Sequence, residues 1–399
     1  MKILLNLVPL KSGGGVQVGL DFVAQARSIG GEHEWGIVAT EGTPFTKLAE
    51  SHNIKILAII GSDIASRVSF ELFGIRRLVA SYKPDIVYTQ FGPTPWLRGV
   101  TNVVGCAYWN LFYPELDAWV RHGFVDSIKK RITDAYRSHS LKRADALIVE
   151  SAAIVLRAQR IHGLPAKKIF HVQPSISSLV SPDRTHAAVK QLCDELPGGF
   201  RVLMLSGYRV HKNIELVPRI ARQLRQLNRN SDIRFILTLR QGDQKTIDIL
   251  HQAAQLGVSD MIDNIGPVPA EGCAELYRSC DAVILPSRGE SVSNNVMESW
   301  IMERPLVVSD LEWARSACGP AAIYFEFDNE HDAAMRLAEL RERPDLYSHI
   351  VQLGREELKK YNTPAGRYQQ YVDVMQTIHQ AGSQGPRITD THTPIHAAN

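Results

Sequence analysis

The stretch "DAVILPSRGESVSNNVMESW", residues 281–300, joins a short apolar run to an amphipathic helix through a polar turn. The run is typical of a buried strand, and the polar turn is typical of a helix start. Short apolar runs alternate with longer amphipathic stretches in the same way along almost the whole chain. This alternation predicts parallel sheets covered by helices on both faces, the α/β class.

The length of 399 residues is too great for one ordinary core, so we expect two domains. The Pro-, Ser- and Gly-rich stretch 174–200 interrupts the alternation and marks the join. The expected parts are an N-terminal Rossmann-like domain over 1–178, a linker over 179–200, a C-terminal Rossmann-like domain over 201–361, a helix over 362–382 packing on the first domain, and a disordered tail over 383–399. Ligands should bind in the cleft lined by the carboxyl ends of both sheets.

The composition, 44% hydrophobic and 22% charged, is that of a soluble globular protein. A formal net charge of +3 argues against binding of nucleic acid or other polyanions. No apolar run approaches the roughly 18 residues that span a bilayer. The five cysteines contain no C-x-x-C pair, which favours reduced thiols in the cytoplasm and no structural zinc.

A glycine-rich turn, "LVPLKSGGGVQV", places Gly13, Gly14 and Gly15 between an expected strand and an expected helix. Glycines there let the backbone approach a ligand, and the following helix offers free N–H groups to an anion. The turn lacks the G-x-G-x-x-G spacing of a dinucleotide site and the Lys-Ser/Thr of a P-loop. A plain tight turn and a ligand loop both remain open.

A second glycine turn, "MLSGYRVHKN", sets Arg209 and Lys212 at a helix entrance. Basic residues there oppose the helix dipole, so local stability does not explain them. They would suit a bound anion such as a diphosphate, although a plain surface position remains the alternative.

Glu290 and Glu298 flank the start of the helix that follows residue 290. Both can reach one site above the helix N-terminus, where carboxylates would accept hydrogen bonds from sugar hydroxyls. Between them, phosphate oxygens could be bound by the backbone N–H groups of Ser291, Val292 and Ser293. The alternative is that Glu290 caps the helix and Glu298 is solvated or pairs with Arg304.

Taken together, these three pieces resemble the retaining glycosyltransferases of the GT-B fold, in the group 1 (family 4) set. The family's signature is two glutamates separated by seven residues, and "PSRGESVSNNVMES" is similar to it. The preceding stretch, "GPVPAEGCAELYRSCDAVILPS", looks like the segment that comes before this signature in the family. "LSGYRVHKN" is similar to the family's G-R-L-x-x-x-K-N, one residue shorter. The resemblance covers residues 1–380 and is specific in 201–326. It implies two doubly wound Rossmann-like domains facing across a cleft.

The resemblance also implies roles for individual residues. Lys212, with Arg209 in place of the family's Arg, would bind the diphosphate, and Glu290 would contact the transferred sugar. Glu298 would bind the nucleotide ribose. The remaining donor-side positions would be the amides of residues 291–293, Asn294, and Gly14 and Gly15 of the closing first domain.

Three departures from the family pattern stand in the sequence. Ser291 and Ser293 replace glycines, and Glu303 or Arg304 stands where a glycine usually precedes the proline. The loop after 103–108, where many members carry a His, reads "GCAYWNLFYPE", so Asn110 is the candidate sugar contact.

The activity that the resemblance implies is a metal-independent, hexosyl-type transfer with retention. The substrate would be a nucleotide-diphosphate sugar, with no cofactor, and the acceptor a hydroxyl of a glycan or lipid-linked glycan in cell-surface polysaccharide or lipopolysaccharide synthesis. No Asp-x-Asp metal motif occurs. The alternatives are a nucleotide-sugar 2-epimerase and a catalytically weak donor-binding scaffold subunit.

The stretch 121–145 is basic, and its apolar residues recur at helical spacing. Such a helix can lie on an anionic membrane surface, which would place the protein at the inner face of the membrane. A packed helix with a solvated face is the alternative.

Overall fold

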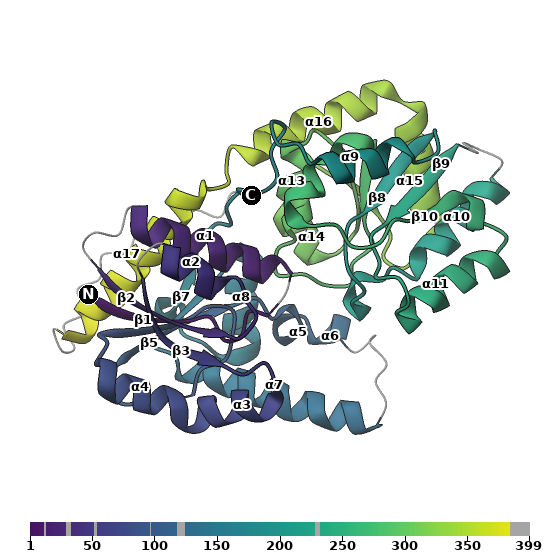
Figure 1. Ribbon diagram of the computed structural model, residues 1–399. Coiled ribbons are helices and arrows are strands. Elements are labelled where there is room, and N and C mark those ends of the chain that lie inside the picture. The colour runs from purple at the N-terminus through teal and green to yellow at the C-terminus, as the bar shows by residue number, and fades with distance from the viewer. Residues whose placement is uncertain are drawn as a thin grey trace.

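The computed structural model describes residues 1–11, 13–28, 33–51, 54–95, 97–117, 124–227 and 232–383. In this part of the chain, two parallel sheets covered by helices stand side by side (Figure 1). The predicted class, α/β with two doubly wound domains, is confirmed. The tail expected at 383–399 lies, beyond Ser383, outside the described residues.

The first sheet has the order β3-β2-β1-β4-β5-β6-β7. Strands β2 and β3 are added on one side of β1 and the later strands on the other, so the topological switch point lies between β1 and β4. Its strands are β1 (Lys2–Asn6), β2 (Glu34–Thr40), β3 (Lys55–Ile60), β4 (Ile86–Thr89), β5 (Thr101–Cys106), β6 (Ala146–Val149) and β7 (Ile169–His171). Its helices are α1 (Gly14–Ser28), α2 (Phe45–Ser51), α3 (Ile64–Ser69), the π-helical turn η1 (Phe70–Gly74), α4 (Ile75–Tyr82), α5 (Trp109–Phe112), α6 (Pro114–Asp117), α7 (Phe124–Arg143), α8 (Ala152–His162) and the 3₁₀ turn η2 (Ala166–Lys168).

The second sheet has the order β10-β9-β8-β11-β12-β13, with the corresponding switch point between β8 and β11. Its strands are β8 (Phe200–Met204), β9 (Ile233–Leu237), β10 (Ile262–Asn264), β11 (Ala282–Leu285), β12 (Leu306–Ser309) and β13 (Ile323–Phe325). Its helices are α9 (Ala187–Asp194), α10 (Leu216–Gln226), α11 (Gln244–Gln255), α12 (Cys273–Ser279), α13 (Asn294–Ile301), α14 (Glu312–Cys318), α15 (Glu330–Glu342) and α16 (Pro344–Leu358), with the 3₁₀ turns η3 (Val210–Lys212), η4 (Ser259–Met261) and η5 (Ala270–Gly272).

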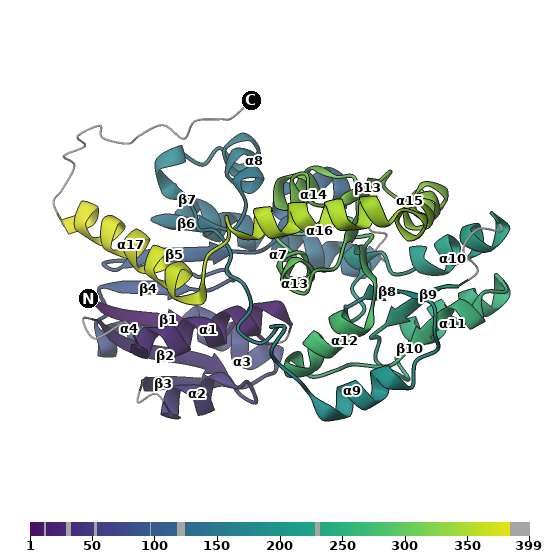
Figure 2. The same ribbon diagram turned by 90° about the horizontal axis from the view of Figure 1, so that it is seen from above.

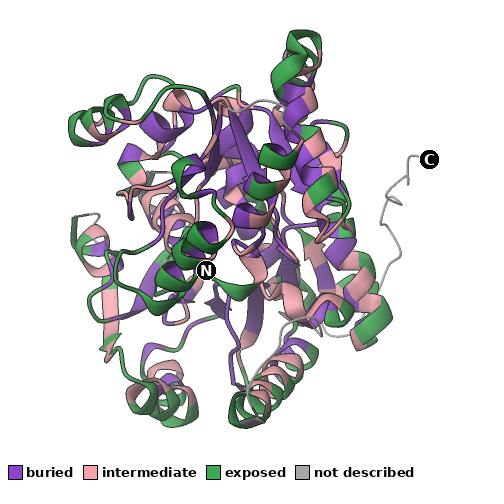
Figure 3. Ribbon diagram, turned by 90° about the vertical axis from the view of Figure 1, so that its right-hand side faces the viewer, coloured by how far each residue is buried: buried purple, intermediate pink, exposed green. Residues whose placement is uncertain are grey.

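The central strands of both sheets are buried, whereas the outer faces of the covering helices are exposed (Figure 3). Strands such as β11, "AVIL", are apolar at every position because helices cover both faces of a parallel sheet. No described helix has the length and apolar character needed to cross a membrane.

The last helix, α17 (Pro364–Ser383), leaves the second domain and packs against α1 in the first (Figure 2). Tyr368 and Tyr371 of α17 pack their rings against Phe22, with centroids 5.1 and 5.7 Å away. Arg367 forms a buried ion pair with Glu150 at the end of β6 and donates to the Tyr371 hydroxyl at 3.1 Å. The C-terminal helix is therefore part of the first domain's core.

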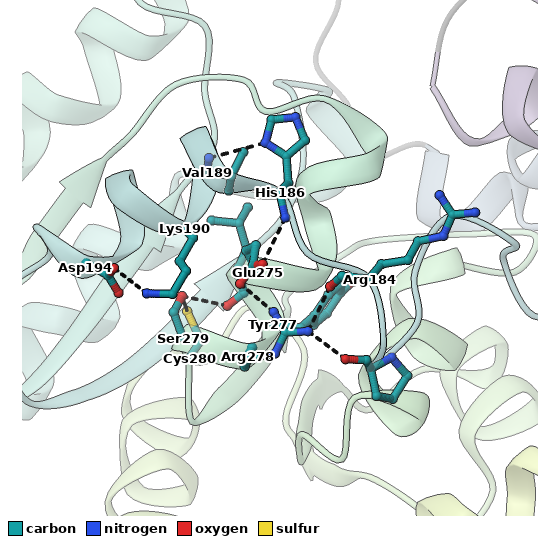
Figure 4. Close-up of polar contacts among 12 residues, drawn as sticks. Arg184, His186, Val189, Lys190, Asp194, Glu275, Tyr277, Arg278, Ser279 and Cys280 are labelled. Carbon is teal, nitrogen blue, oxygen red and sulfur yellow. Dashed lines mark hydrogen bonds and ion pairs between the residues drawn. The ribbon is translucent and has the colours of Figure 1, made fainter.

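The segment expected to be a linker, 179–200, contains a helix, α9. Its apolar residues Val189 and Cys193 lie four apart on one face and are buried, and the helix packs against α12 of the second domain. Arg278 of α12 donates to the carbonyls of Pro182 and Arg184 at 2.8 and 2.9 Å (Figure 4). The Glu275 carboxylate accepts from the backbone N–H of His186 at 3.0 Å (Figure 4).

We predict that Arg367→Leu destabilises the protein by about 3–5 kcal/mol, because it leaves the Glu150 carboxylate buried without its partner. Adding Glu150→Leu should recover most of this loss. Urea unfolding followed by tryptophan fluorescence measures both variants. The exposed Arg343→Leu serves as the control and should unfold at nearly the same urea concentration as wild type. Equal stability of Arg367→Leu and wild type would contradict the predicted role of the pair.

Candidate functional site

The site lies at the topological switch point of the second sheet, between β8 and β11. It is formed by the loops that follow these two strands. These neighbouring central strands end side by side, so the loops leave the sheet at the same edge. The backbone N–H of Arg288 donates to the His211 carbonyl at 2.7 Å and ties the two loops together. Asn295 of α13 donates to the Leu205 carbonyl at 2.8 Å, which fixes the helix to the end of β8.

Lys212 and Glu290, both predicted site residues, form a close ion pair. Lys212 Nζ lies 2.6 Å from Glu290 Oε1, and the two side chains are only 15% and 10% exposed. Burial raises the pKa of Glu290, but the Lys212 ammonium and His211 outweigh it and hold the pKa below its usual value. A partly buried cation and an ionised acid therefore meet at the sheet edge. The alternative that Glu290 caps the helix is wrong, because the N-cap residue is Ser293.

Glu298 is buried on the same helix, and Tyr277 of α12 donates its hydroxyl to Glu298 Oε2 at 2.8 Å. Burial raises its pKa to about 7, although Tyr277 and, more weakly, Lys212 act in the opposite direction. The alternative that Glu298 is solvated or paired with Arg304 is wrong. The Arg304 guanidinium instead donates to the Tyr277 carbonyl at 2.9 Å.

The start of helix α13 differs from the prediction. The helix begins at Asn294, so Ser291, Val292 and Ser293 precede it. The amides at the first positions of the helix are those of Asn294 and Asn295, because Ser293 already has the extended backbone of an N-cap residue. The polar run delays the helix because Ser and Asn favour caps and turns over helix interiors.

The first domain touches this site at two glycine positions. A Cβ on Gly14, at the start of α1, would lie only 3.0 Å from Asn294 Nδ2. A Cβ on Gly289 would lie 2.2 Å from Trp109 of α5, so only glycine fits beneath that indole ring. Gly15 faces inward instead, toward Leu10 and Phe91 of its own domain. Of the two predicted glycines, Gly14 therefore reaches the other domain.

A cavity of about 350 Å³ opens between α5 and α7 of the first domain and η3 of the second, the turn that ends at Lys212. Its lining includes Trp109, Asn110, Lys130, Asp134, Arg137 and His211. Asn110, the predicted sugar contact, is held by the Asp134 carboxylate, to which its amide donates at 3.1 Å.

His211, one residue before Lys212, is a site residue that the sequence reasoning missed. Its ring lies 5.6 Å from the Trp109 ring. Burial lowers the pKa of His211 against the opposing effect of Glu290, so the imidazole is neutral near pH 7. Its position next to Lys212 was the only signal in the sequence.

Two arginines lie near the site: Arg209, which was predicted to bind the diphosphate, and Arg288, which was not. Arg209 is exposed, and its guanidinium donates to the neighbouring Tyr208 carbonyl at 3.1 Å. Arg288, which the sequence reasoning left without a role, is half-buried and donates to Asn213 Oδ1 at 2.6 Å. The structure thus brings together Lys212 and the two glutamates, and the role of Arg209 toward the diphosphate stays a prediction.

The departure before Pro305 is located at Glu303. This residue has a φ of 58°, in the left-handed region that favours glycine. The substitution is accommodated on the surface, where the Glu303 carboxylate pairs with Arg355 at 2.7 Å. Among the described residues, no group of three or more His, Cys, Asp or Glu is placed to hold a metal ion. Metal independence stays a prediction.

Comparison with known proteins identifies the class of this fold. Residues 199–343 match the family model described as glycosyl transferases group 1. D-inositol 3-phosphate glycosyltransferase of Thermobispora bispora is 21% identical over 80% of this chain and 78% of its own length. The crystal structure of Anabaena Alr3699/HepE with UDP-glucose aligns with a TM-score of 0.70 at 15% identity, over 94% of this chain and all of that one.

Two further solved structures set the limits of this likeness. WaaG, a glycosyltransferase involved in lipopolysaccharide biosynthesis, aligns with a TM-score of 0.70 at 11% identity, over 94% of this chain and 99% of its own. A UDP-N-acetylglucosamine 2-epimerase also aligns, with a TM-score of 0.58 at 13% identity, over 98% and 99%. The fold is therefore shared by transferases and epimerases, and the family match is what distinguishes them.

The fold is GT-B, and the enzyme class is that of the glycosyltransferases. The second domain carries a group 1 glycosyltransferase domain over residues 199–343.

We predict that the buried Glu298 makes stability depend on pH. Its pKa is about 7 in the folded protein against an ordinary value of 4.5, so the folded state holds this proton more tightly. Stability should therefore fall by about 3 kcal/mol as the pH rises from 4.5 to 7. Glu298→Gln, which keeps an acceptor for Tyr277, should remove this part of the slope in thermal unfolding between pH 5 and 8. The exposed Glu271→Gln is the control. Parallel profiles for wild type and Glu298→Gln would contradict the prediction.

Proposed function

We propose that the protein transfers a sugar from a nucleotide-diphosphate donor to a hydroxyl of a glycan or lipid-linked acceptor, with retention of the anomeric configuration. The observation that supports the proposal most is the Lys212–Glu290 ion pair at the topological switch point of the second sheet, between β8 and β11. A shielded cation beside a helix N-terminus suits a diphosphate, and carboxylates suit sugar hydroxyls. The Anabaena structure with UDP-glucose has the same fold, which supports a uridine donor as the first to test.

In this proposal each residue of the site has one task toward the donor. Lys212 and the amides of Asn294 and Asn295 bind the diphosphate, and Glu290 accepts hydrogen bonds from the transferred sugar. Glu298 accepts from the ribose hydroxyls, for which its ionised form is the better acceptor. When the diphosphate binds, Lys212 contacts both the diphosphate and Glu290. The partly buried ammonium therefore has an anionic partner with and without bound donor.

The reaction breaks the bond between the anomeric carbon and the diphosphate oxygen and forms a bond to the acceptor oxygen. Negative charge develops on the diphosphate, where Lys212 lies ready, and this kind of preorganised stabilisation is worth more in a site shielded from water. The diphosphate takes the acceptor proton on the face that it leaves. The product then keeps the donor's anomeric configuration, which the anomeric coupling constant in its NMR spectrum reports.

We propose the cavity between α5, α7 and η3 as the acceptor side. It adjoins the ion pair through His211, and its polar lining offers donors and acceptors for hydroxyl groups. Asn110 contributes there as part of the Asp134 network.

A role in cell-surface polysaccharide or lipopolysaccharide synthesis at the inner face of the membrane completes the proposal. The likeness to WaaG supports this role. The five cysteines, all free, fit a reducing compartment such as the cytoplasm.

We predict that Lys212→Ala lowers kcat by about 10²–10³, because one preorganised donor to the developing charge is lost. Release of UDP from UDP-glucose, with and without added acceptor, measures the rate, and other nucleotide sugars follow if UDP-glucose is not turned over. Lys245→Ala, an exposed lysine of the same domain, is the matched control and should keep full activity.

Glu290→Gln in the same assay separates the sugar contact from the charge effect. We expect loss of turnover with donor affinity largely kept, since the diphosphate contacts remain. Full turnover in either Lys212→Ala or Glu290→Gln would refute the proposed site.

A further inference from the structure

Tyr277 of α12 meets Glu298 of α13 in the interior of the second domain. The Tyr277 hydroxyl donates to Glu298 Oε2 at 2.8 Å, and the two residues are only 0% and 5% exposed. A buried carboxylate is costly unless hydrogen bonds replace the water that it has lost. The hydroxyl therefore stabilises the ionised form of Glu298 and fixes the orientation of its carboxylate.

Helix α12, which carries this hydroxyl, is held from two sides. At its end, the Arg304 guanidinium donates to the carbonyls of Tyr277 and Arg278 at 2.9 and 3.2 Å. On another side, Glu275 and Arg278 bind backbone groups of the segment 182–186 (Figure 4). These contacts fix the helix, so the position of the Tyr277 hydroxyl is set by α12 and not by the carboxylate that it meets.

Lys212 and Cys273 also face the Glu298 carboxylate. Lys212 comes from η3, and its positive charge favours the ionised carboxylate. Cys273 lies one turn before Tyr277 on α12, and burial raises the pKa of its thiol to about 12. Burial also raises the pKa of Tyr277 well above its ordinary value. Between pH 6 and 9, Cys273 and Tyr277 therefore stay neutral while Glu298 titrates.

Both protonation states of Glu298 are populated near neutral pH. Burial raises the pKa of this carboxyl to about 7, against the opposing effects of Tyr277 and Lys212. The ionised carboxylate accepts stronger hydrogen bonds from hydroxyl groups than the neutral acid does. A ribose that binds through its hydroxyls therefore selects the ionised state, and its affinity falls as the acid becomes protonated.

We propose that Tyr277 is a positioning residue for the nucleotide: its hydroxyl keeps Glu298 ionised and oriented toward the ribose, so that donor affinity depends on pH. The inference rests on the proposed function, which gives Glu298 the ribose, and adds to it a residue that acts through Glu298. A Tyr277 that only supported the packing of α13 would affect donor affinity equally at every pH.

The test is the affinity of the full chain for UDP, measured by isothermal titration calorimetry between pH 6 and 9. Tyr277→Phe keeps the ring and removes the hydroxyl, so Glu298 should ionise only at higher pH. We expect this variant to bind UDP about tenfold more weakly than wild type at pH 6, and within about twofold of it at pH 9. Ionisation of the UDP phosphate is common to both proteins and cancels in the ratio.

A second variant shows whether Tyr277 acts through the carboxylate. Glu298→Gln cannot ionise, so adding Tyr277→Phe to it should change the affinity for UDP at pH 6 by less than about twofold. Tyr324→Phe is the matched control, because its hydroxyl donates to the Gly319 carbonyl at 2.5 Å and not to a site residue. It should bind UDP as wild type does at every pH.

Two results would overturn the proposed role of Tyr277. One is wild-type affinity of Tyr277→Phe at pH 6. The other is a loss of the same size at pH 6 and pH 9, which would make Tyr277 a structural support alone. Either result, with UDP bound by wild type, leaves the proposed donor site intact.

Failure of the proposed function gives a different result. If wild type binds neither UDP nor ADP, GDP or CDP, the proposed donor site is refuted. The protonation of Glu298 is then decided without nucleotide, by thermal unfolding of wild type and Tyr277→Phe. Because the variant should raise the folded-state pKa of Glu298 further, its loss of stability with rising pH should extend above pH 7. Coincident profiles would overturn the role of Tyr277.

Discussion

The ion pair between Lys212 and Glu290 is the interaction on which the rest of the site depends. It forms because β8 and β11 are neighbours although they are distant in sequence, so the loops that follow them meet at one edge of the sheet. Neither charge would be stable in this partly buried place without the other. In the proposed function, this pair presents a cation to the diphosphate and an acid to the transferred sugar.

The surroundings of Glu290 and Glu298 shift the pKa values of the two carboxyl groups in opposite directions. Lys212 keeps the pKa of Glu290 low, while burial raises the pKa of Glu298 against the opposing effect of its hydrogen bond from Tyr277. Acids whose environments separate their pKa values commonly have different tasks in one site. This separation is consistent with one acid on the sugar and the other on the ribose.

The sequence was sufficient for the α/β class and for the meeting of Lys212 with Glu290, because strand and helix periods are local and the motif spacing is specific. It was not sufficient for the helix α9 inside the expected linker, where Pro and Gly hid a short amphipathic pattern. The start of α13 was misplaced because Ser and Asn suit caps and helices' first turns alike. Trp109 and His211 meet across the two domains, and no local pattern encodes such a contact.

The most direct test is a crystal structure with a non-transferable UDP-sugar analogue. The account predicts that the diphosphate contacts Lys212 Nζ and the first amides of α13, with Glu298 on the ribose and Glu290 on the sugar. A nucleotide sugar bound elsewhere, with the Lys212–Glu290 pair undisturbed and remote from it, would contradict the account.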